Sequence, residues 1–198
     1  MEILAGSIKE VSVVGSSPII FIIALLVALF LIVRQEYWRL ITLALSLVSG
    51  LYSSLLKYLF NEQRPVGYIS TGFIPWERVL KSEAYSFPST HTVWYTVFFG
   101  YLFYLSFKLR GVDKVVRHVA RFFCAFMIVF VGLSRVLLGA HFVKDVVFGY
   151  LFGIVYLSAV IFCERLLYAK RNRGNHGHGR GSSYALKDFW NKDQQKNC

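Results

Sequence analysis

The sequence contains few cysteines, and none of them is placed to form a disulfide framework. Only three of the 198 residues are cysteine. Cys124 and Cys163 lie inside apolar runs, and Cys198 is the last residue. Small domains that depend on disulfides carry paired cysteines at much higher density. We therefore interpret these three as two packing residues and a terminal thiol.

Acidic residues are also scarce, and they do not gather into a metal-binding pattern. Asp and Glu number 11 against 22 Lys and Arg, a net charge of +11. The sequence shows neither paired carboxylates nor a Cys/His cluster at metal-ligand spacing, so we expect no metal or other cofactor. In a soluble chain so much positive charge would indicate nucleic acid. Here the charge is segregated along a membrane chain, and we expect no nucleic-acid partner.

The N-terminus lacks the basic region of a cleaved signal peptide. Met1 to Ser17 contains only Glu2, Lys9 and Glu10 as charged residues. We therefore expect the first apolar run to be retained.

Long apolar runs dominate the rest of the chain. Hydrophobic residues make up 56% of it and the mean hydropathy is +0.50, too apolar for an ordinary soluble domain of this size. The runs predict an all-α, polytopic transmembrane helix bundle with five spans, at about Pro18–Val33, Leu40–Phe60, His91–Phe107, His118–Ser134 and Val146–Cys163. The expected organisation is an interfacial segment or helix at 1–17, a transmembrane domain at 18–168 and a basic, disordered tail at 169–198.

Charge predicts how the bundle is oriented. Five spans place the connecting segments alternately on two sides of the membrane. The segments on one side carry +1, +4 and +5, and those on the other carry −1, +1 and +1. Cytoplasmic loops are enriched in Lys and Arg. We therefore expect a cytoplasmic C-terminus, and we expect the loops after the second and fourth spans to share the extracytoplasmic face.

The loop after the fourth span carries an unusual set of polar residues. Ser134-Arg135 is followed by His141 and, four residues later, by Asp145. If this stretch is helical, residues four apart share a face, and the Asp145 carboxylate holds one ring nitrogen of His141 while the other serves as nucleophile or base. Arg135 supplies a planar charged fork suited to phosphate oxygens. A juxtamembrane loop with charges at the lipid headgroups explains the same residues.

Two further segments on this face carry cations, hydroxyls and a histidine. Arg64 follows Lys57 by seven positions, which is close to two turns of a helix. On a helix ended by Pro65, both side chains would therefore point toward one anion. The alternative is a pair of snorkelling span ends, although Lys57 lies deep for that role.

The second of these segments is Ser86-Phe87-Pro88-Ser89-Thr90-His91-Thr92, which opens the third span. Ser89 or Thr90 is a natural N-cap, and the N–H groups at a helix start bind anions. His91 sits at that helix start. A capped helix with a chance histidine is the alternative. Taken together, the three segments suit phosphoryl transfer, in which positioning and charge stabilisation do most of the work.

In this order and spacing, the motifs resemble the type 2 phosphatidic acid phosphatase (PAP2) superfamily. That superfamily includes short bacterial undecaprenyl-diphosphate phosphatases and shares its site with vanadium haloperoxidases, so the resemblance implies a PAP2/haloperoxidase-like core. It also implies that His141 attacks phosphorus to form a phosphohistidine, that Asp145 orients it, and that His91 protonates the leaving group and then activates water. The implied phosphate-binding residues are Lys57, Arg64, Ser89, Thr90 and Arg135.

The resemblance leaves the substrate open. The family usually has glycine where this chain has Thr90, which puts substrate choice in doubt. The compact chain favours hydrolysis of polyprenyl (undecaprenyl) diphosphate to the monophosphate at the outer membrane face. The alternatives are a phosphatidate, phosphatidylglycerophosphate, lipid A or sphingoid-phosphate phosphatase, a lipid phosphotransferase, or a non-catalytic lipid-binding scaffold. The expected partners are a lipid phosphate substrate and membrane lipids, and the oligomeric state is not predicted.

Overall fold

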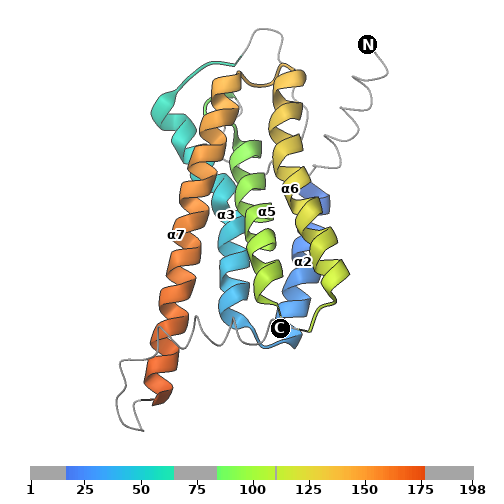
Figure 1. Ribbon diagram of the computed structural model, residues 1–198. Coiled ribbons are helices and arrows are strands. Elements are labelled where there is room, and N and C mark those ends of the chain that lie inside the picture. The colour runs from blue at the N-terminus through green and yellow to red at the C-terminus, as the bar shows by residue number, and fades with distance from the viewer. Residues whose placement is uncertain (1–16, 65–83, 110, 177–198) are drawn as a thin grey trace. The chain divides into compact units, whose positions relative to one another are not determined.

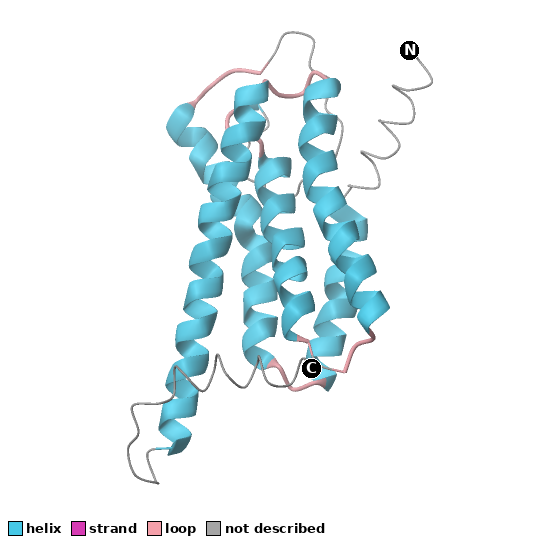
Figure 2. Cartoon of the chain, in the orientation of Figure 1, coloured by secondary structure: helices cyan, strands magenta, loops and turns pink. Residues whose placement is uncertain are grey.

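The computed structural model describes residues 17–64, 84–109 and 111–176, and this part of the chain is helical (Figure 1). Each expected span corresponds to one helix: α2 (Ser17–Val33), α3 (Tyr37–Phe60), α5 (Thr90–Lys108), α6 (Lys114–Leu137) and α7 (Val143–His176). Figure 2 shows no strand in the described residues, and the only strand-like pairing there is a single bridge between Gln63 and Tyr85. The predicted all-α class is confirmed. The expected interfacial segment lies, but for its last residue, outside the described residues.

Three helices are long and apolar enough to cross a membrane, namely Tyr37–Phe60, Lys114–Leu137 and the Val143–Ala169 part of α7. A shorter apolar helix covers Ile19–Val33. Large apolar side chains lie exposed on α2, α6 and α7, as at Leu26, Phe122 and Val155. Exposed apolar surface over several helices is what a lipid-facing bundle presents.

Helix α5 is the most enclosed of the described helices, and aromatic side chains on several of its faces are buried. Trp94, Tyr95, Phe98, Phe99 and Tyr101 are each at most 1% exposed. It packs against α3 and α6, and Figure 1 shows it among the other helices. A helix that is apolar all round is expected at the centre of a bundle.

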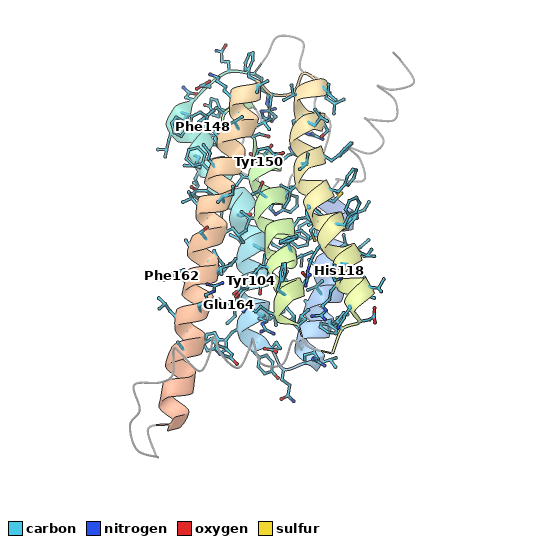
Figure 3. The ribbon with its side chains drawn as sticks, viewed as in Figure 1. Tyr104, His118, Phe148, Tyr150, Phe162 and Glu164 are labelled. Carbon is cyan, nitrogen blue, oxygen red and sulfur yellow. The ribbon has the colours of Figure 1, made fainter. Side chains whose placement is uncertain are left out.

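Two glycines bring the first part of α7 close to α5. A Cβ at Gly149 would lie 2.9 Å from the Cβ of Thr92, and one at Gly153 would lie 2.8 Å from the Cβ of Thr96. Small residues four apart allow two membrane helices to approach this closely. On another side, the Tyr150 hydroxyl of α7 donates to the Ile128 carbonyl of α6 (2.8 Å; Figure 3). The contacts within the chain divide it into two units, Met1–Ile161 and Phe162–Cys198. All candidate site residues belong to the first unit.

Helix α3 ends before Arg64, so Lys57 and Arg64 do not lie on one helix face as predicted. Asn61 adopts the left-handed conformation (φ 48°) and its N–H donates to the Lys57 carbonyl (2.9 Å). Asparagine tolerates this conformation, which ends helices. The last helical residue, Phe60, therefore lies five positions before Pro65, the residue expected to end the helix.

Helix α7 also differs from expectation at both ends. It begins at Val143, so His141 and Asp145 do not share a helix face. It continues to His176, past the change in composition after Tyr168. Ala, Lys and Arg at 169–173 are good helix formers, and adding residues to an existing helix costs little. Residues 177–198, most of the predicted disordered tail, lie outside the described residues.

Candidate active site

Backbone hydrogen bonds join three distant segments at one end of the bundle. The Ser86 N–H donates to the Glu62 carbonyl (2.7 Å), beside the bridge between Gln63 and Tyr85. The Ser89 N–H donates to the Asp145 carbonyl (3.1 Å). The end of α3, the start of α5 and the start of α7 are therefore held together without any side chain.

The loop that carries His141 begins with a Schellman motif at the end of α6. Gly139 has φ +64°, its N–H donates to the Val136 carbonyl, and the Ala140 N–H donates to the Arg135 carbonyl, both at 3.0 Å. This pairing satisfies the last carbonyls of a helix and reverses the chain, and it needs a residue that accepts positive φ. Arg135 lies in the last turn of α6, and its carbonyl also accepts from the His141 N–H (3.3 Å).

The His141 ring is held with its Nε2 atom directed toward Arg64. His141 is 3% exposed, and its Nε2 lies 3.3 Å from Nη1 of Arg64. The same Nη1 donates to the Ala140 carbonyl (3.2 Å). Because a guanidinium only donates, Nε2 must accept and therefore carries a lone pair, which places the proton of the neutral ring on Nδ1. The ring thus has the tautomer that an Nε2 nucleophile requires.

Asp145 closes the start of α7 and lies behind the same ring. Its Oδ2 accepts from the Phe142 N–H (3.0 Å), which is the reciprocal half of a capping box. The same oxygen lies 3.4 Å from Nδ1 of His141, and both side chains are almost completely buried. The predicted His–Asp pair is therefore formed, through a helix start instead of a helix face.

The three predicted cations act on the two histidines from different elements. Lys57, in the last turn of α3, is 0% exposed, and Arg135 is 3% exposed. The charges of Arg64 and Lys57 act on His141, and those of Arg135, Lys57 and Arg64 act on His91. His91 and His141 also interact electrostatically. The structure therefore brings both histidines and all three cations into one electrostatic neighbourhood.

Ser89 and Thr90 begin α5, as predicted, but their side chains do not cap it. Ser89 is the N-cap residue and its side chain makes no capping bond; its Oγ accepts from the Thr92 hydroxyl (3.0 Å). Thr90 is fully buried, and its Oγ1 accepts from the Ser53 hydroxyl of α3 (3.2 Å). The side chain at the usual glycine position is therefore accommodated by a hydrogen bond to the neighbouring helix.

Burial changes the acid–base behaviour of His141. It lowers the pKa of this ring from 6.5 to about 4. The nearby carboxylate of Asp145 opposes the shift, and the positive charges of Arg64 and Lys57 add to it. Removing the ring from water disfavours its charged form. His141 is therefore neutral at pH 7.

We expect an NMR titration of His141 in the folded protein to have its midpoint near pH 4. In Arg64→Gln this midpoint should move to higher pH, because the substitution removes a positive charge beside Nε2. The unfolded chain takes up this proton near pH 6.5, so the folded state should lose stability as the pH falls from 6.5 to about 4. Below that window the group has no further effect. A midpoint near 6.5 in the folded protein would contradict the buried, cation-flanked ring.

Sequence reasoning missed Ser86 and Glu62. In the sequence Ser86 is only the first residue of its motif and has no role assigned to it, yet its hydroxyl contacts both His141 and Asp145. Glu62 forms an ion pair with Lys144, which ties the end of α3 to the start of α7. Spacing predicts neither contact, because the partners lie 59 and 82 residues away in the chain. Among the described residues, no group of three His, Cys, Asp or Glu could hold a metal ion.

The fold and the site define a helical membrane protein with a buried histidine surrounded by cations. Comparison with known proteins names the family: residues 36–167 match the model of the PAP2 superfamily, and the chain belongs to that superfamily. The resemblance noted from the motifs is confirmed.

Two known proteins illustrate the relationship. The chain is 32% identical over 119 residues to a lipid A 1-phosphatase of Rhizobium johnstonii, a match that covers 59% of this chain and 44% of the relative. It thus spans less than half the length of that curated protein. In structure it resembles the first transmembrane PAP2 type phosphatidylglycerolphosphate phosphatase from Bacillus subtilis, with a TM-score of 0.65, 20% identity, and coverage of 83% of this chain and 78% of the other. This likeness shows the shared fold.

Proposed function

We propose that this protein is a membrane lipid phosphatase that hydrolyses a lipid phosphate or diphosphate through a phosphohistidine on His141. The observation that carries the proposal is the Nε2 atom of His141, which carries a lone pair and is held 3.3 Å from the Arg64 guanidinium. A phosphate that takes over the hydrogen bond of Arg64 frees this lone pair for attack. A phosphate drawn to Arg64 is brought to that nitrogen. Membership of the PAP2 superfamily and the phosphatase activities for which the two similar proteins are named support the same conclusion.

The reaction has two steps. First, Nε2 of His141 attacks phosphorus, the bond to the leaving oxygen breaks, and His91 gives that oxygen a proton. Then a water oxygen attacks phosphorus, the N–P bond breaks, and His91 takes the proton from water. Lys57, Arg64 and Arg135, with the N–H groups that follow Ser89 at the start of α5, stabilise the charge on the remaining oxygens, a contribution that is greatest in a buried site.

We further propose polyprenyl (undecaprenyl) diphosphate as the substrate, since this chain is compact. The similar proteins add lipid A and phosphatidylglycerophosphate as alternatives of the same chemistry. The test is phosphate release by the purified protein across these lipids and phosphatidate. Release of inorganic phosphate from at least one lipid is expected, with the highest kcat/KM for the polyprenyl diphosphate. Transfer of phosphate to a second lipid would identify a phosphotransferase, and no turnover of any lipid would refute the enzyme proposal.

The same assay tests the metal requirement. We expect full activity in EDTA, because the proposed chemistry uses cationic side chains to neutralise the phosphate oxygens, and we expect inhibition by vanadate, which mimics pentacoordinate phosphorus. Activity lost in EDTA and restored by Mg²⁺ would contradict the mechanism.

We propose that the site faces the extracytoplasmic side and the C-terminus the cytoplasm. The site lies where α3 and α6 end, whereas the other ends of the helices carry a set of cations: Arg34, Arg39, Lys108, Lys114, Arg117 and Arg121. Cytoplasmic loops favour such residues. In a variant without its native cysteines, a cysteine introduced at Gly181 should resist impermeant thiol reagents in intact cells and react after permeabilisation. Labelling in intact cells would reverse the orientation.

A further inference from the structure

The hydroxyl of Ser86 lies between His141 and Asp145. Ser86 is 0% exposed, its Oγ is 3.3 Å from Nδ1 of His141, and it donates to Oδ2 of Asp145. The direct distance between Nδ1 and Oδ2 is 3.4 Å, and both distances lie just beyond the usual range of an N–H···O hydrogen bond. The serine oxygen therefore offers the ring nitrogen a partner at least as close as the carboxylate itself.

The direction of each hydrogen bond follows from which groups can donate. A carboxylate only accepts, so the single hydrogen of Ser86 goes to Asp145, and the serine oxygen is left to accept. Nε2 of His141 accepts from Arg64, so its ring proton is on Nδ1 and points toward Ser86. The Nδ1–H of His141 therefore donates to Oγ of Ser86, and the O–H of Ser86 donates to Oδ2 of Asp145, so that each hydrogen is used once.

The backbone around Ser86 leaves the hydroxyl little freedom to move. Its N–H donates to the Glu62 carbonyl (2.7 Å). The next residue, Phe87, is 5% exposed and packs edge-on against Phe60 of α3 (4.8 Å between ring centroids) and Phe148 of α7 (5.2 Å). Ser86 is thus held by the same two helices that border the site. A hydrogen-bonding group on such a support fixes its partner accurately.

Other buried serines show what a purely structural hydroxyl does here. Ser46, Ser49 and Ser134 each donate to a carbonyl of their own helix, at 2.7, 2.7 and 2.8 Å. Ser86 instead spans 55 and 59 residues of sequence to reach two members of the proposed site. Its partners are side chains of the proposed reaction machinery.

We propose that Ser86 is a positioning residue for His141. Its oxygen accepts the Nδ1–H of His141 and its hydroxyl donates to Asp145, so that the ring is linked to the carboxylate and Nε2 faces the phosphorus. This inference rests on the proposed function and adds to it a member that contacts no substrate. Partners of this kind, one bond behind the reacting group, typically contribute 10- to 100-fold.

The test is Ser86→Ala, compared with Ser49→Ala as a control of equal size change at an equally buried hydroxyl. We expect kcat and the rate of phosphoenzyme formation to fall about 10- to 100-fold in Ser86→Ala, with KM within about twofold of wild type. Ser49→Ala should behave as wild type. A kcat within about twofold of wild type, or a rise in KM alone, would overturn the proposal.

A double-mutant cycle separates positioning from folding. If Ser86 acts through the His141–Asp145 pair, Ser86→Ala should cost little further activity in an Asp145→Asn background. Fully additive losses, or a lower yield of folded protein with unchanged kcat per folded molecule, would show a structural role only. If Ser86→Ala does not fold, Ser86→Cys keeps the size with a weaker donor and should show the same fall in kcat.

Ring-nitrogen NMR of His141 makes the test independent of turnover. At neutral pH both the wild-type protein and Ser86→Ala should carry the proton on Nδ1, because Arg64 still donates to Nε2. Ser86→Ala should shift the Nδ1–H resonance and speed the exchange of that proton with water, because the proton loses its acceptor. Identical spectra would overturn the role of Ser86 even in an active enzyme. If the wild type turned over no lipid, the proposed function would fail, while these spectra would still decide whether Ser86 positions the ring.

Discussion

His141→Ala should abolish phosphoenzyme formation and lower phosphate release by at least about two orders of magnitude. The substitution removes the only buried imidazole nitrogen that the described residues hold against the Arg64 guanidinium. The measurement is rapid-quench trapping of phosphoenzyme from a ³²P-labelled lipid phosphate, together with steady-state release of inorganic phosphate.

His118→Ala is the matched control for this variant. His118 (Figure 3) is exposed near the start of α6, at the opposite end of that helix from Arg135, and its Nδ1 lies 2.7 Å from the Lys114 carbonyl. Its loss should leave turnover unchanged. Near-normal phosphate release by His141→Ala would remove the phosphohistidine from the mechanism.

His91→Ala should lower turnover of lipid substrates by a similar factor, at least about two orders of magnitude. In this variant the defect is the missing proton for the leaving oxygen. A substrate with a good leaving group, such as an aryl phosphate, does not need that proton. His91→Ala should therefore regain the first step with the aryl substrate and accumulate phosphoenzyme, because water still lacks its base.

The burst of aryl alcohol release distinguishes the two histidines. It should be present in His91→Ala and absent in His141→Ala, and His118→Ala should match the wild type. Equal loss of the burst in both site variants would assign His91 to substrate binding instead of proton transfer.

Local pattern accounts for the parts of this protein that were predicted correctly. Continuous apolar runs of spanning length placed the five helices, because a membrane span must satisfy its backbone internally. Ser89 at the start of α5 followed from a small polar residue before an apolar run. The eight candidate residues stand out in the sequence because each places a reactive or charged side chain at the same end of a span, and their roles in catalysis stay predictions.

The errors came from backbone choices that spacing does not reveal. Asn61 ends α3 by adopting a left-handed conformation, so Arg64 reaches His141 from an extended segment. Val143 begins α7 after His141, so Asp145 meets the ring through a capping bond to Phe142. In both cases the side chains meet although the predicted geometry was wrong.

The sequence by itself determined the helical membrane architecture and the composition of the candidate site. Hydropathy, charge and the chemistry of each residue are properties of short stretches of the chain and do not depend on which distant residues come into contact. Only the tertiary structure decided which nitrogen of His141 is available and that Ser86 stands between it and Asp145. Those facts depend on hydrogen bonds between residues 55 to 77 positions apart. Such bonds exist only once the close packing of α3, α5 and α7 has brought their ends together.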